Sequence, residues 1–144
     1  MALYEDALRR FETIQDHWGA SDSLLALGLI AGENGDHALS RARMAGALEV
    51  SRRIGDVRGT LRVIEAFAQL AALEGQAERA LTLAGAGAAM RRTLGTPLPG
   101  PQQRRLQMTL DAMRQRLESQ QGGAAWMRGW SLSPDAAVTL AFEP

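Results

Sequence analysis

The two histidines are the residues of this chain best suited to acid–base or metal chemistry. His17 and His37 lie well apart in the sequence, and neither belongs to a helical i, i+4 pair with a carboxylate that would suggest a metal site. The chain has no cysteine, which excludes disulfides and thiolate metal sites, and no arrangement of Ser, His and Asp suggests a nucleophilic triad. We therefore predict no catalytic residue, no metal site and no cofactor, and we expect both histidines to face solvent.

Two further patterns resemble reactive sites without fitting them. Glu5 and Asp6 are adjacent, so a helix points their carboxylates apart and a solvated face is expected. The segment 84–88, Ala-Gly-Ala-Gly-Ala, has the glycine content of a phosphate loop, but it follows a helical pattern and lacks the Gly-x-x-x-x-Gly-Lys-Ser/Thr sequence. The chain contains no lysine at all. We expect this segment to serve close helix packing, and we predict that the protein is not an enzyme.

The three tryptophans are the remaining candidates for contact with a ligand. Trp18 follows a predicted turn, and we expect it to pack between structural units. Trp126 and Trp130 are one helical turn apart, so a helix places both on one face, where they can close the end of a helical array. Direct contact with a ligand stays open as the alternative for each.

A constant spacing organises the elements around these side chains. Ile-Gln-Asp at 14–16 is followed by Ile-Gly-Asp at 54–56 and Leu-Gly-Thr at 94–96, so the signal recurs every forty positions, and Gly35 and Gly75 show the same spacing. A fixed period in this range is typical of repeat proteins. The period therefore predicts a binding or scaffolding surface more readily than an enzyme.

Each repeat has the pattern of a helix, a tight glycine turn and a second helix. In the second repeat Asp56 can cap the first helix, and Gly75 can end it in a left-handed conformation. In the first repeat Ser21 or Asp22 can cap, and Gly35 ends the helix. Apolar residues at steps of three or four mark the helices between these signals; in the second repeat they include Leu61, Ile64, Phe67, Leu70, Ala80 and Leu81. Antiparallel helical hairpins are expected.

The chain begins in the middle of this pattern. Residues 3–15 match only the second helix of a hairpin, because Ala7 and Leu8 align with Ala47 and Leu48. An unpaired helix of this kind leaves an apolar face uncovered. We expect the sequence to be a segment of a longer protein.

A proline-rich break separates the repeats from the rest of the chain. Three prolines between 96 and 101 cannot continue a helix. The pattern then predicts a helix over 102–120 ended by Gly122 and Gly123, a short segment at 124–128, and a last helix over 134–142 capped by Ser133. The expected organisation is repeats over 1–95 (a half repeat 1–19, then about 20–55 and 56–95), a connector 96–101 and capping helices over 102–144.

Composition limits the partners of the chain. Sixteen acidic and sixteen basic residues give a formal net charge of zero, which argues against nucleic acid as a partner because phosphate binding needs a basic surplus. No apolar run approaches the ~20 residues needed for a membrane span. We predict no nucleic-acid or membrane partner and a cytoplasmic location.

The hairpins resemble tetratricopeptide repeats. In that family a Leu-Gly pair in the first helix precedes a glycine turn and a small residue in the second helix, and Leu27, Gly28, Gly35 and Ala47 fit one copy. The family aromatics are replaced here, and the longer period is similar to that of large bacterial signalling ATPases of the LuxR and MalT type. The ending Trp126-Met127-Arg128-Gly129-Trp130-Ser131-Leu132-Ser133 is similar to the C-terminal end of those proteins.

The resemblance implies an all-α fold, a right-handed superhelical stack of antiparallel helical hairpins with C-terminal capping helices. It also implies a concave face lined by the first helix of each hairpin. The candidate binding residues on that face are Asp22, Leu25, Leu29, Glu33, Arg62, Glu65, Gln69 and Leu73. The implied function is recognition of a protein, peptide or effector for a larger transcriptional regulator. The alternative is a structural role, in which the segment stacks on its own copies through the N-terminal helix or on preceding repeats.

Overall fold

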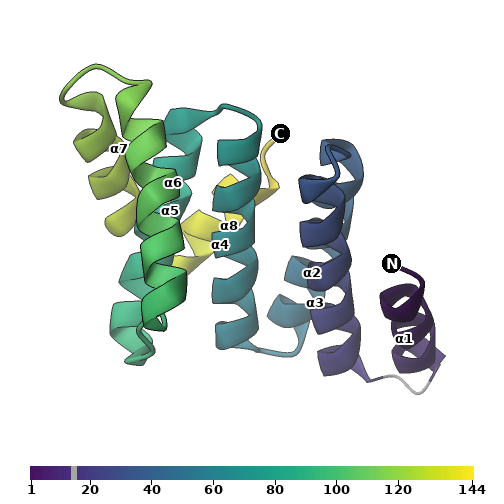
Figure 1. Ribbon diagram of the computed structural model, residues 1–144. Helices are drawn as coiled ribbons and strands as arrows, with labels where there is room; N and C mark the ends of the chain where they lie inside the picture. Colours follow the sequence, from purple (N-terminus) through teal and green to yellow (C-terminus); the bar gives the residue numbers. More distant parts are fainter. Residues whose placement is uncertain (14–15) are drawn as a thin grey trace. The chain divides into compact units, whose positions relative to one another are not determined.

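The computed structural model describes residues 1–13 and 16–144, and the regular secondary structure of these residues is entirely α-helical (Figure 1). The prediction of an all-α fold is thereby confirmed. The tripeptide signal at 14–16 lies partly outside the described residues. The helices are α1 (Ala2–Thr13), α2 (His17–Glu33), α3 (His37–Arg53), α4 (Val57–Leu73), α5 (Ala77–Leu94), α6 (Gly100–Gln115), α7 (Gln121–Trp130) and α8 (Pro134–Phe142).

Four helices in succession end on a glycine in the left-handed conformation. Gly35, Gly55, Gly75 and Gly95 have φ of 85°, 71°, 74° and 66°, and they recur at every twentieth position. Residues with a Cβ rarely adopt this conformation, which explains the glycine. The N–H after each glycine donates to the carbonyl five positions earlier, which satisfies the end of the helix. These hydrogen bonds run from Asp36 to Ala31, Asp56 to Ser51, Gln76 to Ala71 and Thr96 to Arg91.

Aspartates mark the starts of three helices at the same interval. The carboxylates of Asp16, Asp36 and Asp56 each accept the backbone N–H three positions later, at 3.1, 3.1 and 2.9 Å. The prediction that Asp56 caps a helix is confirmed. The prediction that Ser21 or Asp22 caps α2 is wrong, because α2 begins at His17 and both residues lie inside it. Asp16, the residue before α2, accepts the N–H of Gly19 and so satisfies a free N–H group in the first turn of α2.

The chain divides into two compact units, residues 1–66 and 67–144, with the boundary inside α4. In the first unit α2 packs side by side with α3. They come close at Gly28, where an added Cβ would lie 2.6 Å from Cγ of Met44. The Ser40 hydroxyl donates to the Gly28 carbonyl at 2.7 Å and so fixes the same crossing. The predicted division of the chain at 95 and 102, into repeats, connector and capping helices, stays a prediction.

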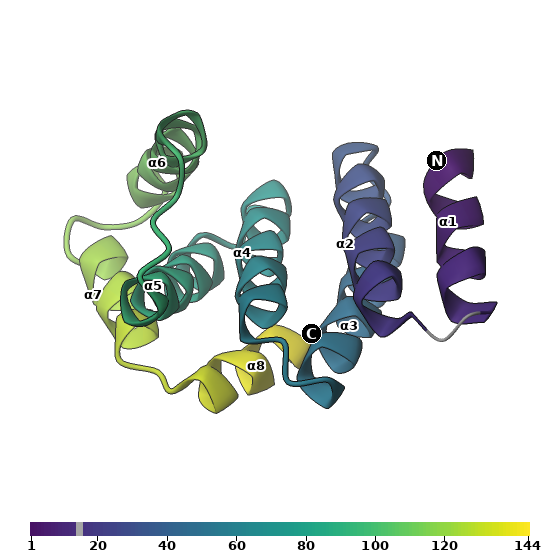
Figure 2. The same ribbon diagram turned by 90° about the horizontal axis from the view of Figure 1, so that it is seen from below.

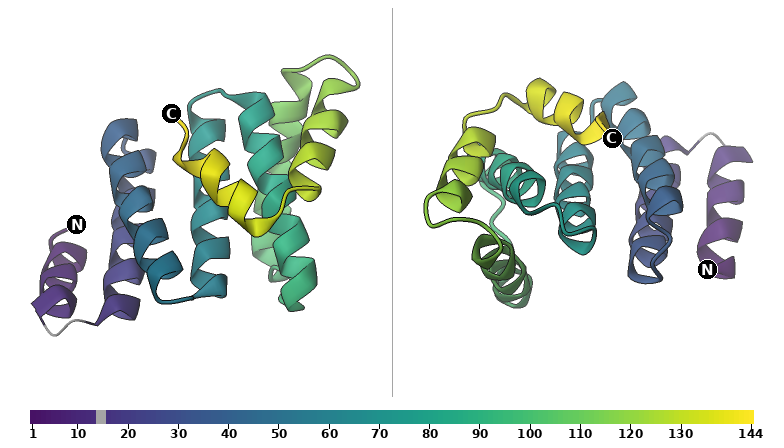
Figure 3. Two further views of the ribbon diagram at one scale, coloured as in Figure 1. Left: turned by 180° about the vertical axis from the view of Figure 1, so that it is seen from behind. Right: turned by 90° about the horizontal axis from the view of Figure 1, so that it is seen from above.

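In the second unit α7 lies alongside α5 (Figure 2). The approach is close, because a Cβ on Gly85 would overlap the carbonyl oxygen of Trp126 and a Cβ on Gly129 would overlap that of Thr82. The prediction that the glycines of 84–88 serve close helix packing is confirmed at Gly85. The helix α6 contacts α5 and buries Leu110 and Met113, and α8 also lies against α5 (Figure 3).

The last three helices differ in part from their predicted limits. The last helix, Pro134–Phe142, is confirmed, and the Ser133 hydroxyl accepts the N–H of Ala136 at 3.1 Å. The prediction that Gly122 and Gly123 end the preceding helix is wrong, since α6 ends at Gln115 and both glycines lie in the first turn of α7. Gly122 is buried there, close to the side chains of Arg114 and Leu81, so a tertiary contact accounts for it.

Candidate binding surface

The predicted binding residues lie on two helices at helical spacing. Four are on α2 and four on α4, at steps of three or four, so each group follows one helix face. Asp22, Glu33 and Arg62 are exposed, whereas Leu25 and Leu29 are half-buried. A face of this kind offers charge at its edges and partly covered leucine side chains between them.

The boundary inside α4 separates these residues into two groups. Arg62 and Glu65 belong to the same unit as the four residues of α2, and Glu65 is half-buried. Gln69 and Leu73 belong to the second unit, where both are exposed; 56% of Leu73 is accessible to solvent. The candidate surface described from here on consists of Asp22, Leu25, Leu29, Glu33, Arg62 and Glu65, and we call it the α2–α4 surface.

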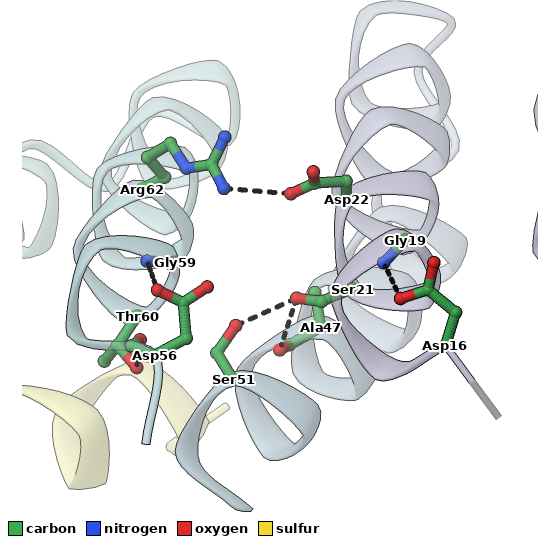
Figure 4. A network of polar contacts seen from close by, with 10 residues as sticks. All are labelled: Asp16, Gly19, Ser21, Asp22, Ala47, Ser51, Asp56, Gly59, Thr60 and Arg62. Atoms are coloured by element: carbon green, nitrogen blue, oxygen red, sulfur yellow. Dashed lines mark hydrogen bonds and ion pairs between the residues drawn. The ribbon is translucent and has the colours of Figure 1, made fainter. Parts of the chain in front are cut away.

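An ion pair joins the two helices of this surface. The guanidinium of Arg62 donates to the carboxylate of Asp22 at 2.9 Å (Figure 4). Both side chains remain open to solvent, with 50% and 62% of their areas accessible. An exposed pair of this type contributes at most about 1 kcal/mol to stability. The contact orients the two charged groups toward each other on the surface.

Buried hydroxyl groups close to the ion pair fix the helices that carry it. The hydroxyls of Ser21 and Ser51 lie 2.8 Å apart, and that of Ser21 also donates to the carbonyl of Ala47 at 3.2 Å (Figure 4). Ser21 and Ser51 are 4% and 0% accessible. Buried polar groups are costly unless paired, so this contact specifies one register between α2 and α3. Asp22, the acidic partner of the ion pair, directly follows Ser21 in α2, so the buried contact of Ser21 also positions Asp22.

The N-cap of α4 also helps to position the helix that carries Arg62. Asp56 is 8% accessible, its carboxylate accepts the N–H of Gly59, and its carbonyl accepts the hydroxyl of Thr60 at 2.9 Å. A Cβ on Gly59 would lie 2.9 Å from Oγ of Ser51, so α4 starts close against the end of α3. Arg62 follows Gly59 within one turn, so the start of α4 determines the direction in which the Arg62 side chain leaves the helix.

The spacing and the charges of Asp22 and Arg62 in the sequence indicate that the two residues can meet. Asp22 and Arg62 are 40 positions apart, the spacing of the recurring sequence signal, and they carry opposite charges. Equivalent positions of neighbouring repeats come close when repeats pack side by side. The sequence predicts both as independent groove residues, and the structure brings them into contact with each other.

The histidines lie at equivalent places outside the α2–α4 surface. His17 and His37 are the first residues of α2 and α3. His17 is exposed and His37 is half-buried. Over residues 1–13 and 16–144, no three or more His, Asp or Glu side chains are grouped so that they could hold a metal ion. None of the helices in these ranges is long and apolar enough to cross a membrane.

The tryptophans differ in their surroundings. Trp126 and Trp130 stack with ring centroids 6.4 Å apart and planes at 25°, which confirms that they share a face of α7. The guanidinium of Arg92 lies 5.8 Å from the centre of the Trp130 ring, a cation–π contact that the sequence did not reveal. Trp18 lies in the first turn of α2 and is 58% accessible, so the expectation that it packs between units is wrong.

Comparison with models of known protein families finds no match, and searches of curated proteins and of solved structures find none either. The resemblance to tetratricopeptide repeats of the LuxR and MalT type therefore stays a prediction from the motifs. The α2–α4 surface offers no grouping of acid, base and nucleophile among its six residues. What it can do chemically is recognise a partner by paired charges beside half-buried leucines.

Proposed function

We propose that the chain is a non-catalytic helical-repeat module that recognises a protein or peptide through the α2–α4 surface. The observation that carries this proposal is the ion pair between Asp22 and Arg62, which joins equivalent positions of consecutive repeats. Repeats aligned in this way form an extended surface from the same face of successive units. Tandem antiparallel hairpins stacked in a right-handed superhelix are the arrangement that we propose for 1–95.

The regular starts and ends of the helices support this arrangement. Aspartate caps at 16, 36 and 56 and left-handed glycines at 35, 55, 75 and 95 give the half repeats the same length and the same turn. Identical turns lead to similar angles between neighbouring helices, which is what a solenoid requires. The tail after Gly95 then serves as the cap that covers the last repeat.

We further propose that the module belongs to a larger bacterial regulator. This rests on the resemblance of the repeat period and of the ending around Trp126–Ser133 to regulators of the LuxR and MalT type. The resemblance implies that the repeat array senses a partner for an output module elsewhere in the protein. The partner expected here is a peptide or helix with apolar side chains for Leu25 and Leu29 and charges that match Asp22 and Arg62.

Selection from a random peptide library tests this function. Peptides selected on the immobilised chain are synthesised, and their dissociation constants are measured by calorimetry against wild type and Arg62→Ala. We expect a loss of tenfold or more for Arg62→Ala. Arg58→Ala is the matched control, since Arg58 is an exposed arginine one turn earlier on α4. Peptides that bind both variants as tightly as wild type, or a library that yields no binder, would reject the α2–α4 surface.

A further inference from the structure

The end of α5 and the start of α6 carry arginines on both sides of the connector that joins them. Arg91 and Arg92 lie in the last turn of α5, and Arg104 and Arg105 lie in the second turn of α6. The short connector 95–99 separates the two helices, which also contact each other (Figure 2). These arginines therefore belong to one end of the helix pair.

Two of the arginine side chains reach the connector, one from each helix. Nη1 of Arg91 donates to the carbonyl of Thr96 at 2.8 Å. Nη1 of Arg104 turns back to the first turn of α6, where it would lie 3.4 Å from a Cβ added to Gly100. Guanidinium groups from α5 and from α6 therefore lie at the two ends of the same connector.

Arg92 and Arg104 are both exposed and carry charges that no acidic side chain balances. Arg92 lies over a tryptophan ring of α7, and among the described residues neither arginine is bonded to a carboxylate. The sequence has no Asp or Glu between Glu78 and Asp111. The carboxylate of Asp111 is bonded to Arg114 of the same helix. The positive charge at this end of the helix pair is thus open to a partner.

Helix electrostatics accounts for the arginines of α5 but not for Arg104 of α6. Cations in the last turn of a helix complement the negative end of its dipole, so Arg91 and Arg92 stabilise α5. The guanidinium of Arg104 lies instead at the first turn of α6, the positive end, where a cation is unfavourable. Residues that act against local stability are typical of functional sites. An anionic group beside Arg104 would balance this charge.

An exposed apolar side chain close to Arg104 indicates which kind of anion fits. Met108 is 73% accessible and lies one turn after Arg104 on the same face of α6. Methionine side chains are flexible and common at surfaces that bind peptides. A partner that matches both residues carries carboxylates and apolar groups. Nucleic acid fits less well, because its phosphates need a basic surplus and the chain has no net charge.

We propose that this end of α5 and α6 binds an acidic peptide segment of another protein. Carboxylates of the segment pair with Arg92 and Arg104, since a guanidinium can donate two parallel hydrogen bonds to a carboxylate, and an apolar side chain covers Met108. We call Arg92, Arg104, Arg105 and Met108 the arginine surface. It lies within the second unit and shares no residue with the α2–α4 surface, so the inference is independent of the proposed function.

The expected affinity is modest and depends on salt. Each exposed ion pair contributes little, so dissociation constants from about 10 μM to about 1 mM are expected at low salt. Added salt should weaken the binding, because exposed charges are screened.

Titration calorimetry with a defined probe tests the proposal. The probe is a short synthetic peptide in which glutamates alternate with leucines, and its control peptide has glutamines in place of the glutamates. The glutamate peptide should bind the wild-type chain within the stated range, and the glutamine peptide at least tenfold more weakly. A wild-type chain that does not bind the glutamate peptide, or that binds both peptides equally, would overturn the proposal.

Two double variants test whether these arginines are responsible. Arg92→Gln/Arg104→Gln should weaken binding of the glutamate peptide about tenfold, the effect of losing two exposed ion pairs. Arg53→Gln/Arg58→Gln is the control with the same change of charge, at two exposed arginines of the first unit, and should bind as the wild type does. Far-ultraviolet circular dichroism checks that both variants keep their helix content. Equal losses in the two variants would reject the arginine surface.

Nuclear magnetic resonance locates the bound peptide. Titration should shift the Nε–H signals of Arg92 and Arg104 and the indole N–H signal of Trp130, while the Nε–H signal of Arg62 stays in place. Shifts at Arg62 without shifts at Arg92 would place the peptide on the α2–α4 surface and overturn this inference alone. A single-stranded oligonucleotide of the same charge is the second probe. If it binds as tightly as the glutamate peptide at equal salt, the surface selects phosphate and the peptide proposal is wrong.

Discussion

The carboxylate of Asp22 lies 2.9 Å from the guanidinium of Arg62, and the two residues are 40 positions apart in the sequence. The contact joins α2 to α4. Close by, the hydroxyls of Ser21 and Ser51 make a buried contact between α2 and α3. An exposed charge pair beside a buried hydroxyl pair sets the register of α2, α3 and the start of α4.

The coupling between Asp22 and Arg62 should be small but measurable. A double-mutant cycle with Asp22→Ala and Arg62→Ala is expected to give an interaction free energy of about 0.2–1 kcal/mol at low salt, the range for exposed ion pairs. Added salt should reduce it, because solvent-exposed charges are screened. Urea unfolding of the four proteins measures it. A coupling of zero at low salt would show that the pair adds nothing to stability, and a coupling that does not change with salt would show that it is not electrostatic.

Replacement of Gly55 is expected to lower the stability of the protein because of its backbone conformation alone. It has φ of 71° with no atom within 4 Å of an added Cβ, so Gly55→Ala should cost about 1–2 kcal/mol through the left-handed conformation. Gly55→Asn should cost less, since asparagine tolerates this conformation. Gly123→Ala is the control, because Gly123 also has an open surrounding but lies in α7 without a positive φ. That variant should be neutral or gain up to about 1 kcal/mol. Effects of the same sign at both positions in thermal unfolding would refute this explanation.

Gly129 is expected to resist replacement for a packing reason. An added Cβ would overlap the carbonyl oxygen of Thr82 and lie 3.0 Å from the backbone nitrogen of Ala86, and neither atom can move without shifting α5. Gly129→Ala should therefore destabilise by about 1–3 kcal/mol and weaken the near-ultraviolet dichroism of the tryptophans on α7. Gly46→Ala is the comparison, because its Cβ would meet only Leu24 at 3.5 Å in ordinary contact. A Gly129→Ala protein as stable as Gly46→Ala would show that α7 lies farther from α5.

The start of α2 gives a direct test of the corrected cap. Asp16→Ala should cost about 1 kcal/mol and should speed amide exchange in the first turn of α2, because the N–H of Gly19 loses its acceptor. Asp22→Ala should leave the exchange of the Gly19 amide unchanged. Exchange followed by nuclear magnetic resonance distinguishes the two. Faster exchange of the Leu25 amide in the Asp22 variant, with Gly19 unchanged in the Asp16 variant, would reinstate the cap first expected from the sequence, because a capping aspartate accepts the N–H three positions later.

Arg79 is expected to hold the C-terminal end of α8. Its Nη2 donates to the carbonyls of Leu140, Ala141 and Glu143 at 3.1, 3.2 and 2.6 Å. Removing these charge-assisted bonds by Arg79→Ala should cost about 1.5–3 kcal/mol. It should also raise hydrogen exchange over 134–142 more than over the rest of the unit. Arg79→Lys should give an intermediate result, since an ammonium lacks the planar fork of guanidinium. Unchanged exchange of α8 in the alanine variant would contradict this role.

The sequence alone determined several helix starts, helix ends and turns of this protein. The glycine turns at 35 and 75, the cap at Asp56 and the last helix at 134–142 all follow from interactions between near neighbours in the chain, and the structure has them where the sequence predicts them. These features depend on φ preferences and on free N–H groups of a first turn, both of which can be read from the residue type. Even the wrong cap at Ser21 comes from the same rule, which cannot choose between several polar residues close to one another.

Only the tertiary structure decided what each helix face meets. It paired Asp22 with Arg62, left Trp18 exposed, and used Gly122 and Gly129 for close approach of α7, although the sequence predicts a helix end at the first of these glycines. These outcomes depend on distances between residues far apart in the chain, which no local pattern specifies. A glycine can end a helix or admit a neighbouring one, and the choice is made by the backbone that packs against it.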